Sequence, residues 1–263
     1  MNLTKKISSF FSKTAYCLPI SLLIFILTLG STVPSYSQDK NDVIELNIRV
    51  HLMQGITVCH STGVCMENWV TPEDVREIIF PEVNAIWEQA NIKWVIESII
   101  EEDVVKDENY EESVAYMATT HRDSKGHSDP VRLDKLYSFM QPEYRTQPDE
   151  VGKNLFHIYL FPFMGNTSQG NAMKKHGMHT CVGTWTNKSK TSTTPRKRLL
   201  VEDHDAYVYG SLSRTIAHEI GHTLGLRHNI CKIKCLMGGK SRGYSLCDSQ
   251  IERSREFAKK RIK

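Results

Sequence analysis

Several common features are absent from this chain of 263 residues. It has no internal repeat and no low-complexity linker, so nothing indicates a repeat array or a string of linked domains. It has one long apolar run, between about residues 15 and 29. That run is shorter than the roughly 20 residues that a helix needs to cross a bilayer. The length suits one large domain or two small ones.

The segment around the apolar run contains no acidic residue. Residues 1–37 contain three lysines, then the apolar run, and then Ser35 and Ser37, two small residues two positions apart. This order is typical of a secretory signal peptide. An uncleaved membrane anchor is the alternative, which the shortness of the run disfavours. We therefore predict export to a secreted or periplasmic location, with no stable membrane association after cleavage.

The rest of the chain has no net charge. Three of the 33 basic residues lie in residues 1–37 and none of the 30 acidic ones, so the remainder carries 30 of each. The formal charge of +3 on the whole chain therefore gives no indication of nucleic-acid binding.

Cysteine is present but not abundant. Of the seven cysteines, Cys17 lies in the predicted signal peptide, which leaves an even number in an exported chain. Up to three disulfides are therefore expected. Cys59 and Cys65 can close a small loop, and the other four can pair in three ways: Cys181, Cys231, Cys235 and Cys247. Metal ligation by Cys231 and Cys235 is the alternative, which export disfavours.

Hydrophobic periodicity divides the remaining chain into strands and helices. Alternation predicts a strand over residues 43–53, with one apolar face formed by Ile44, Leu46, Ile48, Val50 and Leu52. A helix begins at Thr71-Pro72 and runs to Ala90, and Pro81 should interrupt it. The other predicted elements are strands at 92–98, 154–163, 178–187 (at a sheet edge) and 198–203, a loop at 187–197, and helices at 211–226 (capped by Ser211 or Ser213) and 249–262 (capped by Asp248). This order predicts one α+β domain with a mixed, twisted β-sheet.

Residues 101–150 are polar and rich in charge. They have too few apolar side chains to build a core of their own, so we predict an insertion over the domain surface. The domain is then expected to span residues 43–263. Its N-terminal subdomain, at 43–228, carries the insertion, and its C-terminal subdomain, at 229–263, ends in a helix.

Three histidines and one glutamate stand at fixed steps in HEIGHTLGLRH, from His218 to His228. Residues four apart on a helix lie about 40° apart, so His218 and His222 can reach one metal ion. Glu219 is turned about 100° from His218 and can instead reach a water on that metal. Gly225 can take the left-handed conformation that ends a helix, which brings His228 round. Three imidazoles leave a fourth zinc position open to water, as in catalytic zinc sites.

A helix with solvated histidines is the alternative for the first two histidines, and the added steps to Gly225 and His228 disfavour it. The extended pattern, followed by Met237 in a Gly-Gly turn, resembles the metzincin clan of zinc metallopeptidases. The resemblance covers residues 43–263 in outline and 216–239 in specific motif. It implies a metzincin-like catalytic domain with a long zinc-binding helix, one zinc ion held by His218, His222 and His228, Glu219 as general base, and Met237 as a structural turn beneath the metal.

Two features depart from well-known members of the clan, so no subfamily is assigned. Astacin-like and serralysin-like members carry a tyrosine two residues after the methionine, where this chain has Gly239. Only residues 38–42 separate the predicted signal peptide from the first strand, which is too short a stretch for an inhibitory propeptide.

Together these residues predict a secreted zinc-dependent endopeptidase that acts on polypeptides. Glu219 would take a proton from a zinc-bound water and hold it for the leaving amine. The substrate would lie extended along the strand near Cys181–Trp185. A secreted zinc-binding or adhesion protein without turnover is the alternative, which the intact Glu219 disfavours, and a non-peptidase zinc hydrolase is a lesser one. The sequence does not indicate the natural substrate or the oligomeric state.

The remaining histidines are weaker candidates. His176 and His179 in a predicted loop could form a second metal site, and His204 lies between two aspartates, but plain surface roles are expected for all three. His51 and His157 lie in predicted strands, where we expect structural roles.

Overall fold

The computed structural model describes residues 42–262 apart from 61–62, 119–135, 137, 145–154, 165–169, 174–178, 190–191, 196–210, 229–234 and 239–242. The described residues belong to one unit of the chain, Asp39–Lys263. The predicted signal peptide, the strand predicted at 198–203, and the histidines His176 and His204 lie outside the described residues, so these predictions stay untested. Among the residues described, no helix is long and apolar enough to span a membrane.

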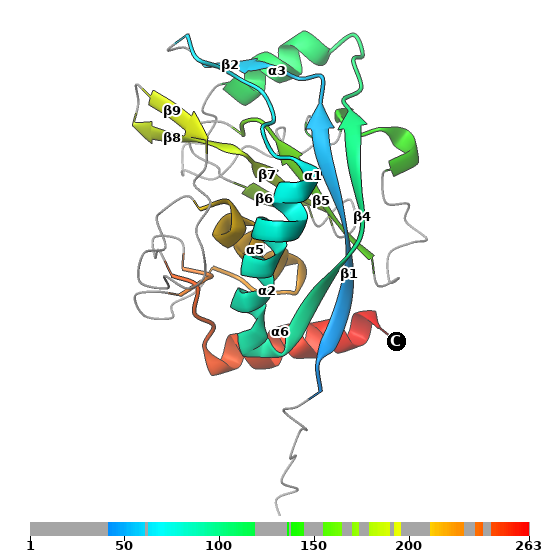
Figure 1. Ribbon diagram of the computed structural model, residues 1–263, viewed down its shortest axis with the longest axis vertical. Helices are drawn as coiled ribbons and strands as arrows, with labels where there is room; N and C mark the ends of the chain where they lie inside the picture. The colour runs from blue at the N-terminus through cyan, green and yellow to red at the C-terminus, as the bar shows by residue number, and fades with distance from the viewer. Residues whose placement is uncertain are drawn as a thin grey trace, which may run out of the picture. The chain divides into compact units, whose positions relative to one another are not determined.

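A five-stranded sheet with the order β4-β1-β5-β7-β6 forms the centre of this unit (Figure 1). Four of its strands are parallel: β1 (Ile44–Gln54), β4 (Ile92–Asp103), β5 (Leu155–Phe161) and β7 (His179–Gly183). The fifth strand, β6 (Gly170–Met173), pairs antiparallel with β7. The mixed sheet that the sequence predicts is therefore confirmed, in a structure that combines this sheet with helices.

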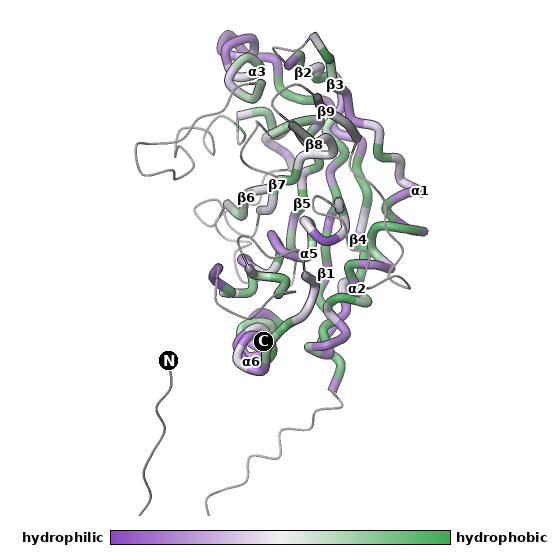
Figure 2. The backbone as a smooth tube through the Cα atoms, turned by 90° about the vertical axis from the view of Figure 1, so that its left-hand side faces the viewer, coloured by the Kyte–Doolittle hydropathy of each residue, from purple (hydrophilic) through white to green (hydrophobic). Residues whose placement is uncertain are grey.

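The alternation predicted for the first strand is also confirmed. One face of β1 is buried in the main core, and its residues are at most 2% exposed: Ile44, Leu46, Ile48, Val50 and Leu52. Full burial of one such side chain contributes about 2 kcal/mol. Figure 2 shows the hydrophobic residues running along the strands and α2 (Phe80–Trp87). The opposite face of β1 carries polar residues, including Arg49 and His51.

The helix predicted from Thr71 to Ala90 is present and interrupted. Thr71 caps α1 (Pro72–Asp74), a π turn η1 (Val75–Ile79) follows, and the chain continues as α2 and a 3-10 turn η2 (Glu88–Ala90). Pro81 is near the start of α2 and has no backbone N–H to donate to the preceding turn, which accounts for the break.

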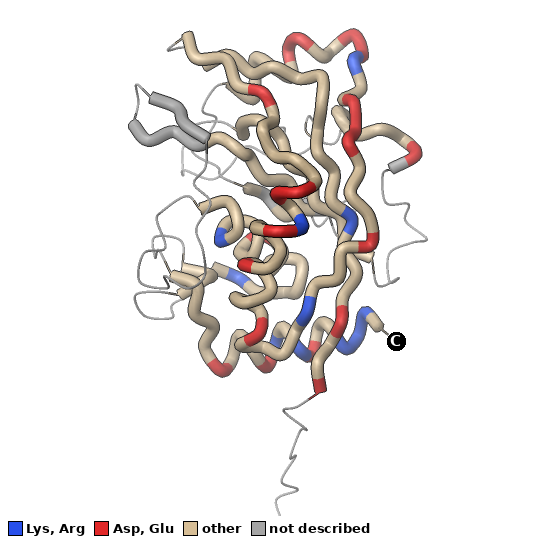
Figure 3. The backbone as a smooth tube through the Cα atoms, viewed as in Figure 1, with Lys and Arg blue, Asp and Glu red and all other residues tan. Residues whose placement is uncertain are grey.

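Two later helices complete the described part. α5 (Leu212–Thr223) contributes to the same core as α2, so both cover one face of the sheet. α6 (Asp248–Arg261) begins one residue earlier than predicted, because Cys247 and not Asp248 takes the N-cap position. Figure 3 shows basic residues together in the last turn of α6, where they oppose the negative end of the helix dipole: Lys259, Lys260 and Arg261.

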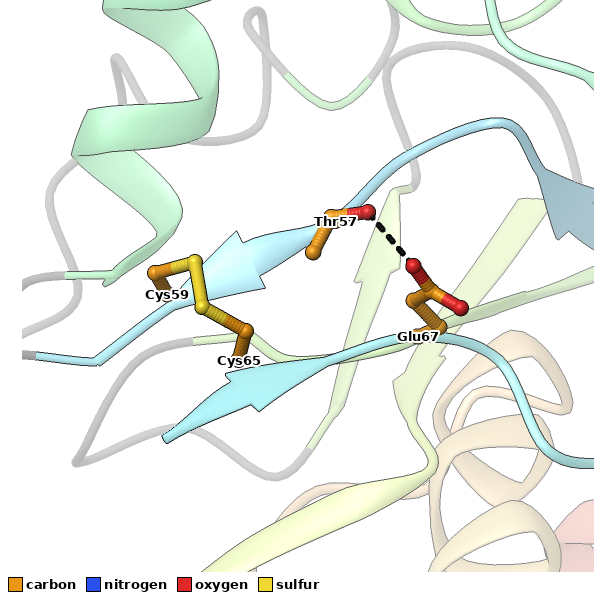
Figure 4. Close-up of a disulfide and its surroundings, with 4 residues drawn as sticks. All are labelled: Thr57, Cys59, Cys65 and Glu67. Carbon is orange, nitrogen blue, oxygen red and sulfur yellow. Dashed lines mark hydrogen bonds between the residues drawn. A yellow bond between two sulfur atoms is a disulfide. The ribbon is translucent and has the colours of Figure 1, made fainter. Parts of the chain in front are cut away.

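One predicted disulfide is present, between Cys59 on β2 (Val58–Cys59) and Cys65 on β3 (Cys65–Met66) (Figure 4). The two strands form a short antiparallel hairpin. Thr57 Oγ1 donates a hydrogen bond of 2.9 Å to Glu67 Oε1 across the same hairpin. No disulfide joins Cys181, Cys235 and Cys247 to one another, although any full pairing of the remaining four cysteines needs one such bond, so the prediction of three disulfides is wrong for these described residues. Cys231 lies outside the described residues.

One strand prediction and one loop prediction are wrong. The strand predicted at 178–187 is not at the sheet edge, because β7 has β5 on one side and β6 on the other. The edge beyond β7 is β6, whose sequence GNAM has no apolar periodicity and so does not predict a strand. The loop predicted at 187–197 is partly an antiparallel hairpin of β8 (Trp185–Ser189) and β9 (Ser192–Pro195). Its polar sequence lacks the apolar alternation that would have predicted these strands.

The described part of residues 101–150 packs more closely than its polar composition predicts. β4 extends to Asp103, five residues beyond the predicted end, and α3 (Tyr110–Ala118) follows. Apolar residues of this segment join a second core on the other face of the sheet: Val104, Met117, Leu136, Phe139 and Met140. These residues are scattered among charged ones, so their common burial emerges only when the chain folds back on the sheet.

Candidate metal centre

The centre is built on α5 and the turn that ends it. Ser211 caps the helix by accepting a hydrogen bond from Arg214 N, which confirms one of the two predicted caps. Gly225 has φ +77°. Gly225 N donates to His222 O and Leu226 N donates to Gly221 O, at 3.1 and 3.0 Å, which are the two bonds of a Schellman motif. The chain reverses there as predicted.

The reversal brings the three predicted histidines together. His228 Nε2 lies 3.0 Å from His218 Nε2 and 3.1 Å from His222 Nε2. In the described residues these three side chains form a group whose ligand atoms all lie within 4.8 Å of one another. Zinc–nitrogen bonds of about 2.0–2.1 Å at tetrahedral angles separate nitrogens by about 3.3 Å, close to these distances.

Backbone carbonyls determine which ring nitrogen is available. His218 Nδ1 donates to Leu236 O at 2.7 Å and His222 Nδ1 donates to Leu226 O at 2.8 Å, because a carbonyl can only accept. Burial lowers the pKa of His218 to about 3, so this ring is neutral at pH 7. The Nε2 atom of His218 therefore carries a lone pair directed at His228, and so does that of His222 when its ring is neutral.

This arrangement fits a metal ion better than it fits hydrogen bonding. One proton on His228 Nε2 serves only one of the two short contacts well, and the other contact then brings two lone pairs together. A cation that accepts all three lone pairs removes that conflict. The Nδ1 bonds are those that metal-ligating histidines usually make to carbonyls or carboxylates.

Glu219 lies beside this group and not in it. Its side chain is mostly buried, and the edge strand β6 approaches it closely: a Cβ atom on Gly170 would lie 2.5 Å from Glu219 Cγ. Only glycine at position 170 leaves that space. Sequence reasoning missed Gly170 because its role depends on two segments 49 positions apart in the chain.

Met237 lies in a turn under the helix. Gly238 N donates to Cys235 O at 3.3 Å, and Cys235 forms an isolated bridge with Ser245. The Met237 side chain is fully buried, and a Cβ atom on Gly221 would lie 2.8 Å from its sulfur. Met237 therefore packs against α5 between the positions of the first two histidines. Gly239 lies outside the described residues.

The chain is similar to one protein family and to solved structures. Residues 201–231 match the family model described as Met-zincin. The chain is similar to a zinc-dependent peptidase from Methanocorpusculum labreanum (strain Z), with 17% identity over 79% of this chain and 99% of that chain and a TM-score of 0.40. It is also similar to a chain in a chaperone–substrate complex, with 13% identity over 78% of this chain and 29% of that one and a TM-score of 0.33. No curated protein sequence matches significantly.

The segment matched to the family model contains the three converging histidines, Glu219 and Gly225. The family resemblance inferred from the sequence is thereby confirmed: the chain is metzincin-like, with no subfamily assigned.

Proposed function

We propose that this protein is a secreted zinc-dependent endopeptidase that binds one zinc ion. The observation that carries the proposal is the convergence of His218, His222 and His228 on one point, with the Nδ1 atoms of the first two held by carbonyls. Secretion rests on the signal peptide predicted at residues 1–37, and the Cys59–Cys65 disulfide agrees with an oxidising compartment.

The three histidines would hold the metal through Nε2. When bound, zinc supplies Lewis acidity, which makes water a nucleophile near neutral pH. Glu219 follows His218 directly and points to a different side of the helix, so it would act on substrate and water and not as a ligand. Its carboxylate would accept the proton of the attacking water and deliver it to the leaving amine.

The substrate would bind along β6, which corrects the placement near Cys181–Trp185 expected from the sequence. Among the described strands, β6 pairs with β7 alone, so its other side can accept an extended peptide through main-chain hydrogen bonds. β6 also lies against Glu219 at Gly170. A peptide added to this edge would therefore run past the general base.

The test uses purified protein and Glu219→Ala, with Glu256→Ala on the exposed surface of α6 as the matched control. We expect the parent and Glu256→Ala to cleave a denatured protein, and a chelator to stop them. Glu219→Ala should lose about 10²- to 10⁴-fold in rate while keeping its zinc and its circular dichroism spectrum.

Two other outcomes contradict the proposal in different ways. Cleavage by Glu219→Ala at the parental rate would show that the assigned mechanism is wrong. A parent protein that holds zinc but cuts no member of a diverse peptide library would instead be a binding or adhesion protein of the same fold. The library also reports the cleavage specificity.

A further inference from the structure

Arg214 is a buried cation on α5, one helical turn before His218. Its side chain is 7% exposed, although arginine is almost always charged and on the surface. Residues four apart on a helix share a face, so Arg214 and His218 point toward the same neighbouring segment. That segment contains Met237.

The guanidinium of Arg214 binds both sides of this segment. Arg214 Nε donates to Gly243 O at 3.0 Å, and Arg214 Nη2 donates to Leu236 O at 2.9 Å. The two sides are also joined to each other, because Leu236 N donates to Ser245 O at 2.8 Å. Arg214 therefore fixes the backbone around Leu236 from the helix side.

The Leu236 carbonyl is shared between Arg214 and a predicted metal ligand. Its oxygen also accepts the 2.7 Å hydrogen bond from His218 Nδ1, and a carbonyl oxygen has two lone pairs for two donors. The position of this one oxygen sets both the tautomer and the ring orientation of His218. A group that holds the oxygen in place thereby orients the ligand.

We propose that Arg214 is a positioning residue of the metal centre: by fixing the Leu236 carbonyl, it orients His218 for metal binding. This inference rests on the proposed zinc site. Removing such indirect partners of metal ligands typically weakens metal affinity by about 10- to 100-fold. The planar fork of arginine matters here, because a lysine ammonium cannot span both Gly243 O and Leu236 O in the same way.

Arg255 on α6 supplies a matched control. It is 8% exposed and also donates to backbone carbonyls, those of Ala90, Asn91 and Asp42, at 2.7, 3.4 and 3.0 Å. None of these carbonyls accepts a hydrogen bond from a histidine of the metal centre. Arg255 thus shares the structural role of Arg214 without the connection to a ligand.

The experiment compares Arg214→Lys with Arg255→Lys, both of which keep the positive charge. Zinc affinity is measured by competition with a chromophoric chelator, and the visible spectrum of the cobalt-substituted protein reports the ligand geometry. We expect Arg214→Lys to bind zinc at least about 10-fold more weakly than the parent and to change the cobalt spectrum. Arg255→Lys should bind zinc within about twofold of the parent, although it unfolds at a lower temperature.

A second pair of variants tests the same proposal if Arg214→Lys folds poorly. Arg214→Ala leaves space for free guanidinium ion, which at low millimolar concentration should restore zinc affinity, whereas Arg255→Ala should show no such response. Equal zinc affinity of the two lysine variants, or no restoration by guanidinium, would overturn the role of Arg214. Weak zinc binding by the parent protein itself would instead count against the proposed function.

Discussion

Two histidine clusters in the described residues have nearly the same spacing and opposite chemistry. In the metal centre, His218 Nε2 and His228 Nε2 are 3.0 Å apart. On the sheet, His51 Nε2 and His157 Nδ1 are also 3.0 Å apart. The difference lies in the partners of the remaining ring nitrogens.

In the sheet cluster, His51 has a partner at each of its two ring nitrogens. His51 Nδ1 lies 2.6 Å from Glu102 Oε2, and the other oxygen of Glu102 accepts a hydrogen bond from Gln141 N at 2.6 Å. Burial lowers the pKa of His51 to about 3, so the neutral ring donates from Nδ1 to Glu102 and accepts from His157 at Nε2. Both nitrogens of His51 are used, and Tyr159 stacks on the ring at 4.2 Å.

The comparison shows what separates a ligand from a structural histidine. In the metal centre the acceptors are carbonyls of the turn, which use up Nδ1 and leave the Nε2 lone pairs converging. In the sheet cluster, each short contact has a donor and an acceptor, so no cation is needed. The distance between two histidine rings therefore does not identify a metal site, whereas the hydrogen-bond partner of the second ring nitrogen does.

The largest expected effect is a loss of stability when the hydrogen bonds of the sheet cluster are removed. Glu102→Ala leaves the buried His51 Nδ1–H and the partly buried Gln141 N–H without their acceptor, which should cost about 4 kcal/mol of unfolding free energy. For a domain of this size that is a fall in melting temperature of about 10 °C. Zinc affinity should not change. Calorimetry and chelator competition test both parts, and a loss of zinc affinity in folded Glu102→Ala would mean that the two clusters are coupled.

The next largest effect is a loss of zinc affinity when one ligand of the metal centre is removed. His222→Gln removes a ligand, so zinc affinity should fall by at least about 100-fold, or about 2.7 kcal/mol. Mutating a residue that only hydrogen-bonds to a ligand already lowers metal affinity by up to about 100-fold. The metal-free protein should keep its stability, because the His222 ring is partly exposed. His157→Gln is the matched change in the sheet cluster. It should lower the stability of the protein and leave its zinc affinity unchanged. Similar zinc affinity in the two variants would contradict the assignment of His222.

A third substitution, beside the metal centre, tests whether the position of Glu219 affects catalysis without affecting zinc binding. Gly170→Ala places a methyl group where Glu219 Cγ lies, so kcat should fall about 10-fold through misplacement of the carboxylate. Zinc affinity should stay the same, since Glu219 is not a ligand. Gly63→Ala is the control, because a Cβ there meets nothing within 4 Å, although its φ of +84° strains the backbone. An unchanged kcat for Gly170→Ala would remove Gly170 from the site.

The smallest effect concerns the surface beside the sheet cluster. Hydrogen bonds from Arg49 and Ser98 lower the pKa of Glu97 to about 2, below its ordinary value of 4.5. A lowered pKa stabilises the folded state above pH 4.5, and this contribution is lost as the pH falls from 4.5 toward 2. The pair is partly exposed, so Glu97→Gln should cost only about 0.5 kcal/mol at pH 7. Urea unfolding should show this difference shrinking below pH 4.5, and a constant difference would assign it to packing.

Local patterns predicted the parts of the protein that local chemistry decides. The alternation of β1, the cap at Ser211, the turn at Gly225 and the convergence of the histidines all depend on residues within a few positions of one another. Segments without their own periodicity were not predicted. β6 and the β8–β9 hairpin are short and polar, and they become strands only through pairing with a partner.

The same division holds for the candidate site. The sequence indicated the ligand set and the general base, because helical geometry converts spacing directly into direction. It did not indicate that Arg214 is buried, since nothing local distinguishes this residue from a solvated arginine. It did not indicate the role of Glu102 either, because an acidic residue in an acidic stretch is expected on the surface.

By itself, then, the sequence determined that three imidazoles point toward one place, because 3.6 residues per turn and one left-handed glycine leave the chain few alternatives. Only the tertiary structure decided which carbonyls hold the Nδ1 atoms, which strand lies at the sheet edge and which glycine makes room for Glu219. Those contacts join segments far apart in the chain, and their positions result from the packing of the whole core.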